Sequence, residues 1–243
     1  MTSERRDRTE KLIGSEGVAR LEGASVMIFG LGGVGGYALE ALARAGVGEL
    51  WLVDFDTVSE SNCNRQLLAL TETVGRLKTE VAAERARSIN PDAVVHTVSC
   101  FADEESIPAL LAEASPSYIV DAIDTVKSKL TIIREAKARG IPVISCMGTG
   151  NKLDPSRFVI GDLAVSSVCP LARVMRAELR HLGISGVTAL WSTEEPTKAV
   201  AENANGRHSP ASISYVPSVA GLLIGGYVIR ELSGIHMKGT DDQ

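Results

Sequence analysis

The chain has 243 residues, of which 44% are hydrophobic and 23% are charged, and its formal net charge is −5. This length supports one substantial hydrophobic core, so we expect one domain with extensions rather than two domains. The acidic balance argues against a protein that coats nucleic acid nonspecifically, although it leaves room for a local basic face.

The N-terminus carries no apolar signal segment, and the longest apolar run, residues 219–229, is too short to span a bilayer. We therefore expect a cytoplasmic protein. The four cysteines, Cys63, Cys100, Cys146 and Cys169, lie far apart and need not pair in a reducing compartment. None belongs to a Cys-x-x-Cys motif, so we expect no structural zinc site.

A short helical segment is predicted over residues 8–23, where apolar residues recur at helical spacing. The polar residues before it, and the polar residues 234–243 at the other end, are expected to fray unless a partner holds them. On composition alone, Arg8 is a solvated arginine in this N-terminal arm.

Residues 25–46 (SVMIFGLGGVGGYALEALARAG) predict a strand, a glycine turn and a helix. Gly30, Gly32 and Gly35 have the spacing G-x-G-x-x-G. In such a turn the first glycine permits the tight bend, the second lets the backbone approach a phosphate, and the third lets helix and strand pack closely. The N-terminus of the helix then offers free amide groups to an anion.

A glycine pattern alone is weak, because a tight turn in any α/β protein uses one. Here the next predicted strand, ELWLVD, ends in Asp54, about twenty residues further on, where a carboxylate meets ribose hydroxyls. The combination favours nucleotide binding over a structural turn, and leaves the nucleotide open.

A long polar loop follows Asp54 and contains Asn62, Asn64, Arg65 and Gln66. Long loops in compact domains are usually functional or disordered, and this cluster of side-chain donors favours function. The helix predicted next, over residues 77–89, has Lys78 in its first turn. A lysine there opposes the helix dipole unless it faces an anion, so an ordinary exposed lysine and an anion ligand stay equally open.

Apolar runs and helical patterns then alternate. Strands are predicted over residues 93–99, 117–124 and 141–147, and helices over residues 103–114 and 126–140. This alternation predicts a Rossmann-like, mostly parallel sheet with helices on both faces and ligands at the carboxyl ends of the strands. Asp54, Asp121 and Asp124 fall at such ends. Asp121 is placed to cap or brace a turn, and Asp124 to reach a metal or water.

The pattern changes after Gly148 to a C-terminal extension of mixed strands and helices. The prediction begins with an irregular or hairpin-prone stretch over residues 148–170 and a helix over residues 170–183. A strand over residues 187–196, a polar loop over residues 197–215 and a buried helix over residues 216–232 follow. Arg173, Arg176 and Arg180 lie on one face of the first helix. Such a face is most often a solvated surface, but it is also a candidate contact for a phosphate backbone. We divide the single domain into an N-terminal helical arm (1–24), a nucleotide-binding core (25–150) and the extension (151–243).

Four ordered motifs carry a resemblance to a known family. They are the glycine turn GLGGVGG, the strand end and loop LVDFDTVSESNCNRQ, the helix start VGRLKTEVAAERARSINP and the strand end VDAIDT. Together they resemble the adenylating domain of the ubiquitin-activating-enzyme-like superfamily, of the ThiF/MoeB/HesA type. A dehydrogenase shares only the first motif and part of the second.

This resemblance implies roles for individual residues. Asp54 would bind the ribose of ATP, and Asn62, Arg65 and Lys78 would hold its phosphates. Arg65 and Lys78 would offset the negative charge that moves toward pyrophosphate. Asp124 would hold Mg²⁺, a cation that bridges substrate phosphates. The full set implied for the nucleotide is Gly30, Gly32, Gly33, Gly35, Asp54, Asp56, Asn62, Arg65, Gln66, Lys78 and Asp124.

Arg8 gains a different meaning from the resemblance. It stands where the family places an arginine that is donated to the ATP of the other subunit in a homodimer. The resemblance therefore implies a catalytic set of Arg65, Lys78 and Asp124, completed by Arg8 in trans.

Four later segments decide the branch of the superfamily: SCMGTGNKLDPSRFVIGDL, PLARVMRAELRHLGI, WSTEEP and SYVPSVAGLLIGGYVI. They are similar to those of the tRNA threonylcarbamoyladenosine dehydratase family, and the similarity covers essentially the whole chain. It implies ATP-dependent activation of the threonyl carboxylate on a modified adenosine in tRNA, followed by closure to a cyclic form with loss of water. The candidates for contact with tRNA are Arg173, Arg176, Arg180, Arg207 and His208, which places the substrate on the side of the extension.

Two positions depart from the pattern of that family. Cys169 stands where we expect an acidic residue, and Trp191 stands where some relatives have a cysteine, so no thioester forms at that position. A direct route fits, because both reacting groups belong to one substrate molecule and no covalent enzyme intermediate is needed. Cys63 and Cys146 are interpreted as packing residues rather than nucleophiles.

Three alternatives stay open. The first is an adenylyltransferase for the C-terminus of a ubiquitin-like sulphur-carrier protein, although such enzymes usually carry two Cys-x-x-Cys zinc pairs. The second is an NAD-dependent oxidoreductase, which gives no role to Arg65, Lys78 or Asp124. The third is a noncatalytic nucleotide sensor. The sequence also leaves open a monovalent cation, a sulphur-transfer or redox helper protein, and loose membrane association through the apolar C-terminal helix.

Overall fold

The computed structural model describes residues 3–197 and 210–235. Within them the strands form one sheet in the order β3-β2-β1-β4-β5-β7-β6. The strands are β1 Ser25–Phe29, β2 Glu49–Val53, β3 Val94–Val98, β4 Tyr118–Asp121, β5 Val143–Cys146, β6 Phe158–Asp162 and β7 Thr188–Ser192. Neighbouring strands pair in parallel except β6 and β7, which are antiparallel.

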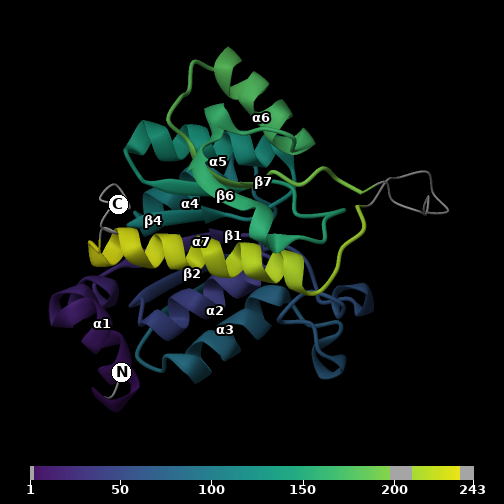
Figure 1. Ribbon diagram of the computed structural model, residues 1–243. Coiled ribbons are helices and arrows are strands. Elements are labelled where there is room, and N and C mark those ends of the chain that lie inside the picture. Colours follow the sequence, from purple (N-terminus) through teal and green to yellow (C-terminus); the bar gives the residue numbers. More distant parts are fainter. Residues whose placement is uncertain (1–2, 198–209, 236–243) are drawn as a thin grey trace, which may run out of the picture.

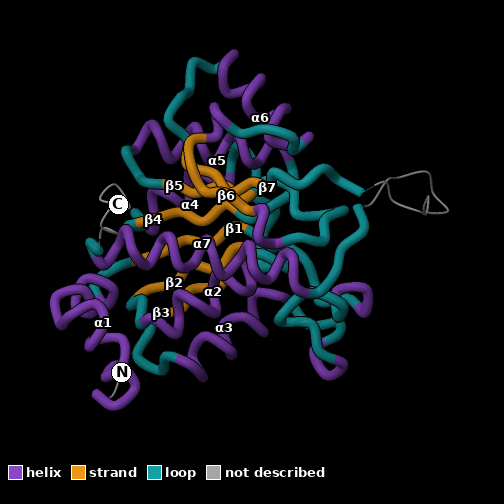
Figure 2. Tube along the Cα trace, viewed as in Figure 1, coloured by secondary structure: helices purple, strands orange, loops and turns teal. Residues whose placement is uncertain are grey.

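Helices cover the two faces of this sheet. They are α1 Ser3–Glu22, α2 Gly35–Ala45, α3 Lys78–Ile89, α4 Ser106–Ala114, α5 Val126–Arg139, α6 Pro170–His181 and α7 Tyr215–Ser233. Short 3₁₀ turns occur at Glu60–Asn62, Thr71–Thr73, Pro155–Arg157 and Leu163–Val165. Figure 1 shows α2, α3 and α7 on one face and α4, α5 and α6 on the other, and Figure 2 shows the strands between these two layers. The predicted fold class is confirmed.

The central strand β1 shows why both faces need helices. Val26 and Ile28 are fully buried against α2, α3 and α7, whereas Met27 and Phe29 are fully buried against α4 and α5. Successive side chains of a strand point to opposite faces, so an uninterrupted apolar run requires a cover on each side. The run SVMIF therefore specifies a central strand.

The N-terminal helix is longer than the sequence suggested. It begins at Ser3 and takes in polar residues that were expected to fray, with a break at Gly14, where φ is 73°. Its C-terminal part packs Val18 and Leu21 into the core beside α2 and α7. The N-terminal segment is thus a bent helix attached to the body of the domain.

The segment predicted to be irregular contains β6, which pairs with β7 from Phe158↔Ser192 to Asp162↔Thr188. Because β7 also pairs in parallel with β5, the C-terminal residues extend the same sheet. No helix within residues 3–197 and 210–235 is long and apolar enough to cross a membrane.

The order of the strands reverses between β1 and β4. The chain moves outward from β1 to β2 and β3, then returns to the other side of β1 for β4 and β5. In open α/β sheets the carboxyl ends of the strands diverge at such a point and leave a crevice that binds ligands. The topology therefore fixes where the functional site is expected.

Candidate functional site

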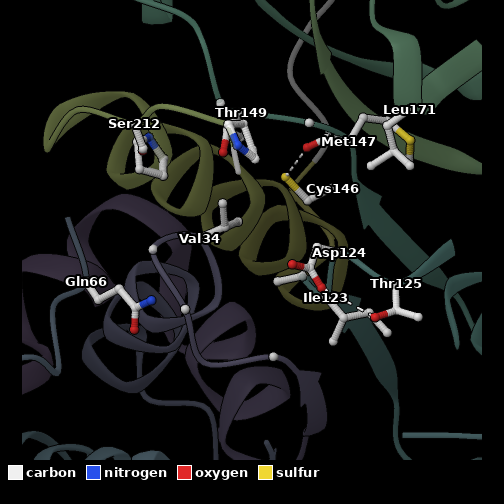
Figure 3. Close-up of a pocket in the computed structure, with 18 of the residues that line it drawn as sticks. Val34, Gln66, Ile123, Asp124, Thr125, Cys146, Met147, Thr149, Leu171 and Ser212 are labelled. Carbon is white, nitrogen blue, oxygen red and sulfur yellow. Dashed lines mark hydrogen bonds between the residues drawn. The ribbon is translucent and has the colours of Figure 1, made fainter. Parts of the chain in front are cut away.

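A cavity of about 800 Å³ lies at this point. It brings together the predicted residues Gly30, Gly32, Gly33, Asp54, Asp56, Asn62, Arg65, Gln66, Lys78 and Asp124. The loops after β1 and β2 form one side, and the loops after β4 and β5 form the other. Figure 3 shows Gln66 on the first side and Asp124, Thr125 and Met147 across from it on the second side.

The glycines of the turn have two functions: some allow close packing of the backbone, and one leaves space in the cavity for a ligand. Gly30 has a φ of +88°, and a Cβ added there would lie 2.9 Å from the carbonyl oxygen of Ala122. A Cβ on Gly35 would lie 1.7 Å from the carbonyl oxygen of Gly30, so Gly35 serves packing and does not line the cavity. At Gly32 the nearest atom would be the Gln66 side-chain nitrogen at 3.8 Å. The second glycine therefore keeps the cavity open for a close ligand.

Asp54 is held rigidly at the end of β2. Its carboxylate accepts hydrogen bonds from the backbone N–H of Leu31 at 2.6 Å and of Asp56 at 2.9 Å. The bond from Leu31 joins the end of β2 to the glycine turn, and each oxygen keeps a free lone pair. Asp54 is thus positioned to accept from hydroxyl groups of a ligand at this turn.

Lys78 faces an anion of the protein itself. Its ammonium group lies 2.7 Å from a carboxylate oxygen of Asp56, and its side chain is almost completely buried. This ion pair explains how a lysine is tolerated in the first turn of α3, and it excludes the exposed alternative. An incoming phosphate would share or displace Asp56 as the partner of Lys78.

The loop after β2 folds into short turns that present its polar side chains. Arg65 donates to the carbonyl oxygen of Ser61 at 3.0 Å and to the side-chain oxygen of Asn64 at 2.7 Å. Asn62 is buried and accepts from the backbone N–H of Ser59 at 3.3 Å. No carboxylate neutralises Arg65 among the described ion pairs, so its charge is available to an anionic ligand.

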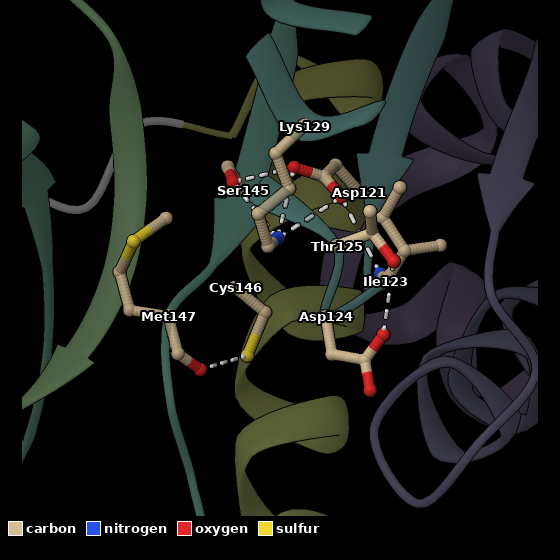
Figure 4. Close-up of polar contacts among 8 residues, drawn as sticks. All are labelled: Asp121, Ile123, Asp124, Thr125, Lys129, Ser145, Cys146 and Met147. Carbon is tan, nitrogen blue, oxygen red and sulfur yellow. Dashed lines mark hydrogen bonds and ion pairs between the residues drawn. The ribbon is translucent and has the colours of Figure 1, made fainter. Parts of the chain in front are cut away.

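Asp124 is the free carboxylate of the site. It is exposed in the loop between β4 and α5, where one oxygen accepts a long bond, 3.4 Å, from the hydroxyl of Thr125 (Figures 3 and 4). The described residues contain no group of three or more His, Cys, Asp or Glu side chains that could hold a metal. Mg²⁺ is commonly held by one carboxylate together with substrate phosphates, so Asp124 fits that ion when a nucleotide is bound.

A fully buried ion pair, Asp121 and Lys129, lies close to Asp124 in the same part of the structure (Figure 4). The ammonium of Lys129 is 3.0 Å from both oxygens of Asp121 and 3.3 Å from the hydroxyl of Ser145, which donates to Asp121 at 2.6 Å. Asp121 also accepts a long bond from the backbone N–H of Ile123. Asp121 therefore braces the turn, as expected, and in addition ties β4 to α5 and β5.

The sequence reasoning did not single out Lys129. A signal was present, because Lys129 stands three, four and seven residues before Ile132, Ile133 and Ala136, on the apolar stripe of α5. A charged residue in that position needs a buried partner. Asp121, at the end of the adjoining strand, is that partner.

Two phenylalanines at the mouth of the cavity were also missed. Phe55 and Phe101 follow β2 and β3, and both are exposed. Their rings meet edge to face with centroids 5.1 Å apart. Exposed aromatic side chains beside a polar cavity offer an apolar surface to a planar ring.

The arginine face of α6 differs from the prediction. Arg173 and Arg180 are exposed, but Arg176 is half-buried and donates to the carbonyl oxygen and the hydroxyl of Ser166, at 2.7 and 2.6 Å. Arg176 is therefore not part of a fully solvated arginine face, because Ser166, next to the 3₁₀ turn, supplies acceptors for its guanidinium. Arg207 and His208 lie outside the described residues.

Arg8 does not belong to the cavity of its own chain. It lies on the exposed face of α1. Figure 1 shows α1 at the end of the molecule away from the loop that follows β2. A function for Arg8 in a site of this kind requires a second copy of the chain.

The cysteines range from exposed (Cys63) through half-buried (Cys100) to buried (Cys146 and Cys169). Cys146 is buried at the end of β5, where desolvation raises the pKa of its thiol to about 12. Its interpretation as a packing residue agrees with this burial. Cys63 is exposed in the loop after β2, so its interpretation as a packing residue is wrong. Asn62 and Leu68 of this loop are buried, whereas the side chain of Cys63 lies in solvent.

The chain was compared with known families and structures. The model of the ThiF family matches residues 5–242. This chain belongs to the ThiF family. The predicted superfamily is thereby confirmed, and the position of the cavity at the glycine turn and Asp124 agrees with the four motifs that carried the resemblance.

Within the ThiF family, the chain is similar to tRNA threonylcarbamoyladenosine dehydratase of Bacillus subtilis, with 40% identity over 97% of this chain and 98% of that protein. The solved structures of E. coli tRNA N6-threonylcarbamoyladenosine dehydratase, TcdA, in complex with ATP and with AMP match with TM-scores of 0.86 and 0.89. They are 32% and 31% identical and cover 96% of this chain and 95% of theirs. Molybdopterin-synthase adenylyltransferase of Salmonella typhimurium is 38% identical over 54% of this chain and 51% of that protein.

Proposed function

We propose that this protein adenylates the carboxylate of threonylcarbamoyladenosine in tRNA with ATP and then cyclises the group with loss of water. One observation carries the proposal: a single cavity combines a glycine turn open to phosphates, cations that include Arg65 and Lys78, and the uncommitted carboxylate of Asp124. An oxidoreductase would leave the cations and Asp124 without a role. The match to tRNA threonylcarbamoyladenosine dehydratase of Bacillus subtilis covers almost the whole chain, whereas the match to the adenylyltransferase covers only about half of it. This difference favours the tRNA substrate over a sulphur-carrier protein.

ATP would lie along the side of the cavity formed by β1 and β2. Asp54 accepts from the ribose hydroxyls, and the exposed rings of Phe55 and Phe101 lie beside the base. The phosphates lie over Gly32, within reach of Arg65 and Lys78. Fixed positive charge that faces the departing pyrophosphate is worth far more in a partly closed site than in water.

Asp124 would hold Mg²⁺, which would supply positive charge to the phosphates of the nucleotide. The ion pair of Asp121 and Lys129 fixes the turn on which Asp124 stands. The protein thus contributes a rigid support for one exposed carboxylate.

The reaction proceeds in two balanced steps. A carboxylate oxygen of the substrate forms a bond to the α-phosphorus of ATP, and the bond to the β-phosphate oxygen breaks with its electron pair leaving on pyrophosphate. A carbamoyl nitrogen or oxygen of the same substrate then attacks the acyl carbon, the carbamoyl group loses an N–H proton, and AMP departs with the original carboxylate oxygen. Because both groups belong to one molecule, the second step has the advantage of an intramolecular reaction.

The active form would be a homodimer with two-fold symmetry. Arg8 is exposed on α1 and does not line its own cavity, and the family resemblance implies that it serves the cavity of the partner subunit. A guanidinium from the partner would complete the positive charge around the phosphates.

Other proposals rest on the sequence alone. The protein would act in the cytoplasm, with or without loose membrane association through the apolar α7. A monovalent cation and a helper protein that transfers sulphur or electrons would be additional partners.

The proposed function is tested by ATP–pyrophosphate exchange with tRNA that carries threonylcarbamoyladenosine. Exchange should require the modified tRNA and should not respond to unmodified tRNA. Arg65→Ala, Lys78→Ala and Asp124→Ala should each lower exchange by about 100-fold or more, with an unchanged circular dichroism spectrum. Arg44→Ala, which removes an exposed arginine of α2, is the matched control and should have no effect.

Two outcomes would contradict this proposal. Exchange that is stimulated by a ubiquitin-like protein ending in Gly-Gly, and not by modified tRNA, would identify a sulphur-carrier adenylyltransferase. Near-normal exchange by Asp124→Ala would remove the metal role of that residue.

A further inference from the structure

A lysine with no assigned role lies in the wall of the same cavity. Lys152 follows β5, lines the cavity and is only 4% exposed. Among the described residues, no ion pair or hydrogen bond to its ammonium group is present. The fully enclosed and unpaired side-chain atoms in this part of the chain belong to Arg6, Ser25, Gln66 and Trp191. The Lys152 nitrogen is absent from that group and therefore keeps some accessible surface, in a residue that lines the cavity.

An unpaired buried ammonium is costly, because burial removes water from the charge without supplying a partner. Other buried lysines of this protein avoid that cost: Lys78 pairs with Asp56 and Lys129 with Asp121. Lys152 differs from both. A cation kept in a cavity without a protein partner is placed to receive an anion from a ligand.

The backbone on both sides of Lys152 is fixed by long-range hydrogen bonds. Asn151 adopts a positive φ of 58°, which is uncommon outside glycine, and its backbone and side chain bond to Ala211. On the other side, the N–H groups of Leu153 and Asp154 both donate to the carboxylate of Glu194, at 2.9 Å. This bracing holds Lys152 in one place, as a binding residue requires.

The position of Lys152 indicates which anion it receives. The phosphates of ATP are matched by the cations on the side of β1 and β2, namely Arg65 and Lys78. Lys152 belongs to the segment after β5, which also contributes Met147 and Thr149 to the lining, and Asp124 comes from the neighbouring loop after β4. We propose that Lys152 binds the carboxylate of the threonylcarbamoyl group and holds it for attack on the α-phosphate. This inference rests on the proposed function.

The charge balance of the first step supports this role. A substrate carboxylate and the triphosphate are both anions, and their repulsion opposes the approach of oxygen to phosphorus. An ammonium beside the carboxylate offsets that repulsion and directs one oxygen toward the α-phosphorus, while keeping all its protons. Because its ammonium attracts a carboxylate, Lys152 favours binding of the acid over a neutral analogue. The acyl adenylate that forms when pyrophosphate leaves no longer has that carboxylate charge.

The test compares binding of free threonylcarbamoyladenosine with that of its methyl ester. In the wild-type protein with a non-hydrolysable ATP analogue, the acid should bind at least about 10-fold more tightly than the ester. Lys152→Met keeps the volume and removes the charge, so the acid and the ester should then bind equally. Lys152→Arg should restore part of the preference. Arg44→Met, which removes an exposed charge on α2, is the control for net charge and should keep the full preference.

The kinetic readout should agree with the binding. Lys152→Met should lower kcat/KM for modified tRNA by about 100-fold, while its Kd for ATP changes less than about twofold. Its thermal denaturation midpoint should not fall, because the substitution breaks no ion pair within the described residues.

Each other outcome overturns a specific claim. If Lys152→Met still prefers the acid, Lys152 does not bind the carboxylate, although the function of the enzyme stands. If the variant binds ATP much more weakly but AMP normally, Lys152 binds the terminal phosphates instead. If the wild-type protein shows no exchange with modified tRNA, the proposed function itself fails, and this inference fails with it.

Discussion

At the scale of single residues, α5 contains one lysine in a buried ion pair and one lysine in an exposed ion pair. Lys129 is fully buried beside Asp121, whereas Lys127 is 77% exposed and lies 3.6 Å from Glu104. A surface pair contributes little because water screens it, but breaking a buried pair leaves a charge without compensation. The two positions, two residues apart in one helix, form a matched pair.

Lys129→Met should lower the free energy of unfolding by about 3–5 kcal/mol, because the Asp121 carboxylate is left buried and unpaired. Lys127→Met should change it by less than about 0.5 kcal/mol. Urea-induced unfolding followed by circular dichroism measures both. The double variant Lys129→Met/Asp121→Asn should recover part of the stability, because no buried charge then remains at this position. Equal effects of the two single variants would show that the buried pair is not special.

Thiol chemistry provides a second prediction for single residues. Desolvation raises the pKa of Cys146 to about 12, so its thiol stays protonated and unreactive well above neutral pH. Cys63 is exposed. At pH 8 an aromatic disulphide reagent should therefore label Cys63 in the native protein, and Cys146 only after unfolding. Mass spectrometry of labelled peptides locates each thiol, and rapid native labelling of Cys146 would contradict its burial.

At the scale of elements, α6 combines two kinds of arginine. Arg173 and Arg180 are exposed, whereas Arg176 is bound to Ser166 and thereby fixes α6 to the turn that follows β6. An arginine that already satisfies protein acceptors has little left to offer a phosphate. We therefore expect Arg173 and Arg180 to contact tRNA and Arg176 to attach the helix to the rest of the protein.

The double variant Arg173→Gln/Arg180→Gln should weaken tRNA binding and reduce the slope of log K against log salt by about 1 for each phosphate that is no longer bound. Arg176→Gln should leave that slope unchanged and should instead destabilise the fold by about 1–3 kcal/mol, because the acceptors of Ser166 lose their donor. Filter binding over a potassium chloride series and thermal denaturation measure the two effects. An unchanged slope in the double variant would exclude α6 from the tRNA surface.

At the scale of the whole molecule, the proposed donation of Arg8 in trans can be tested against the position of Asp124. Arg8 stands on α1, and Asp124 stands in the cavity at the switch point of the sheet. A homodimer with two-fold symmetry would place each Arg8 at the partner's cavity. Donation of Arg8 between subunits predicts that two inactive variants regain activity when they form mixed dimers.

Arg8→Ala and Asp124→Ala should each be inactive alone, but a refolded mixture of the two should regain roughly a quarter of the wild-type activity. In a mixed dimer, one cavity has its own Asp124 and receives an intact Arg8 from the partner. Pyrophosphate exchange measures the recovery, and mixing Arg65→Ala with Asp124→Ala is the control that should stay inactive, because both changes lie in the cavity of the same chain. No recovery in the first mixture would refute the donation of Arg8 in trans.

The sequence by itself determined the class of the fold and the side of the cavity that is formed by the glycine turn and Asp54. The strand Ser25–Phe29, the glycine turn and Asp54 lie within about thirty residues of each other, so their spacing reports a local geometry that can be recovered without the fold. The apolar runs identified buried parallel strands for the same reason. Local period and spacing are properties of the chain before it folds.

Only the tertiary structure decided how distant residues pair. The partners of Lys129 stand on two different strands, the acceptors of Arg176 lie in a turn, and the bracing of Lys152 comes from Glu194 and Ala211. In the sequence these lysines and arginines are equivalent surface candidates, because charge alone does not specify a partner. Folding separates them: Lys129 and Arg176 find protein partners, while Lys152 faces the cavity without one among the described residues.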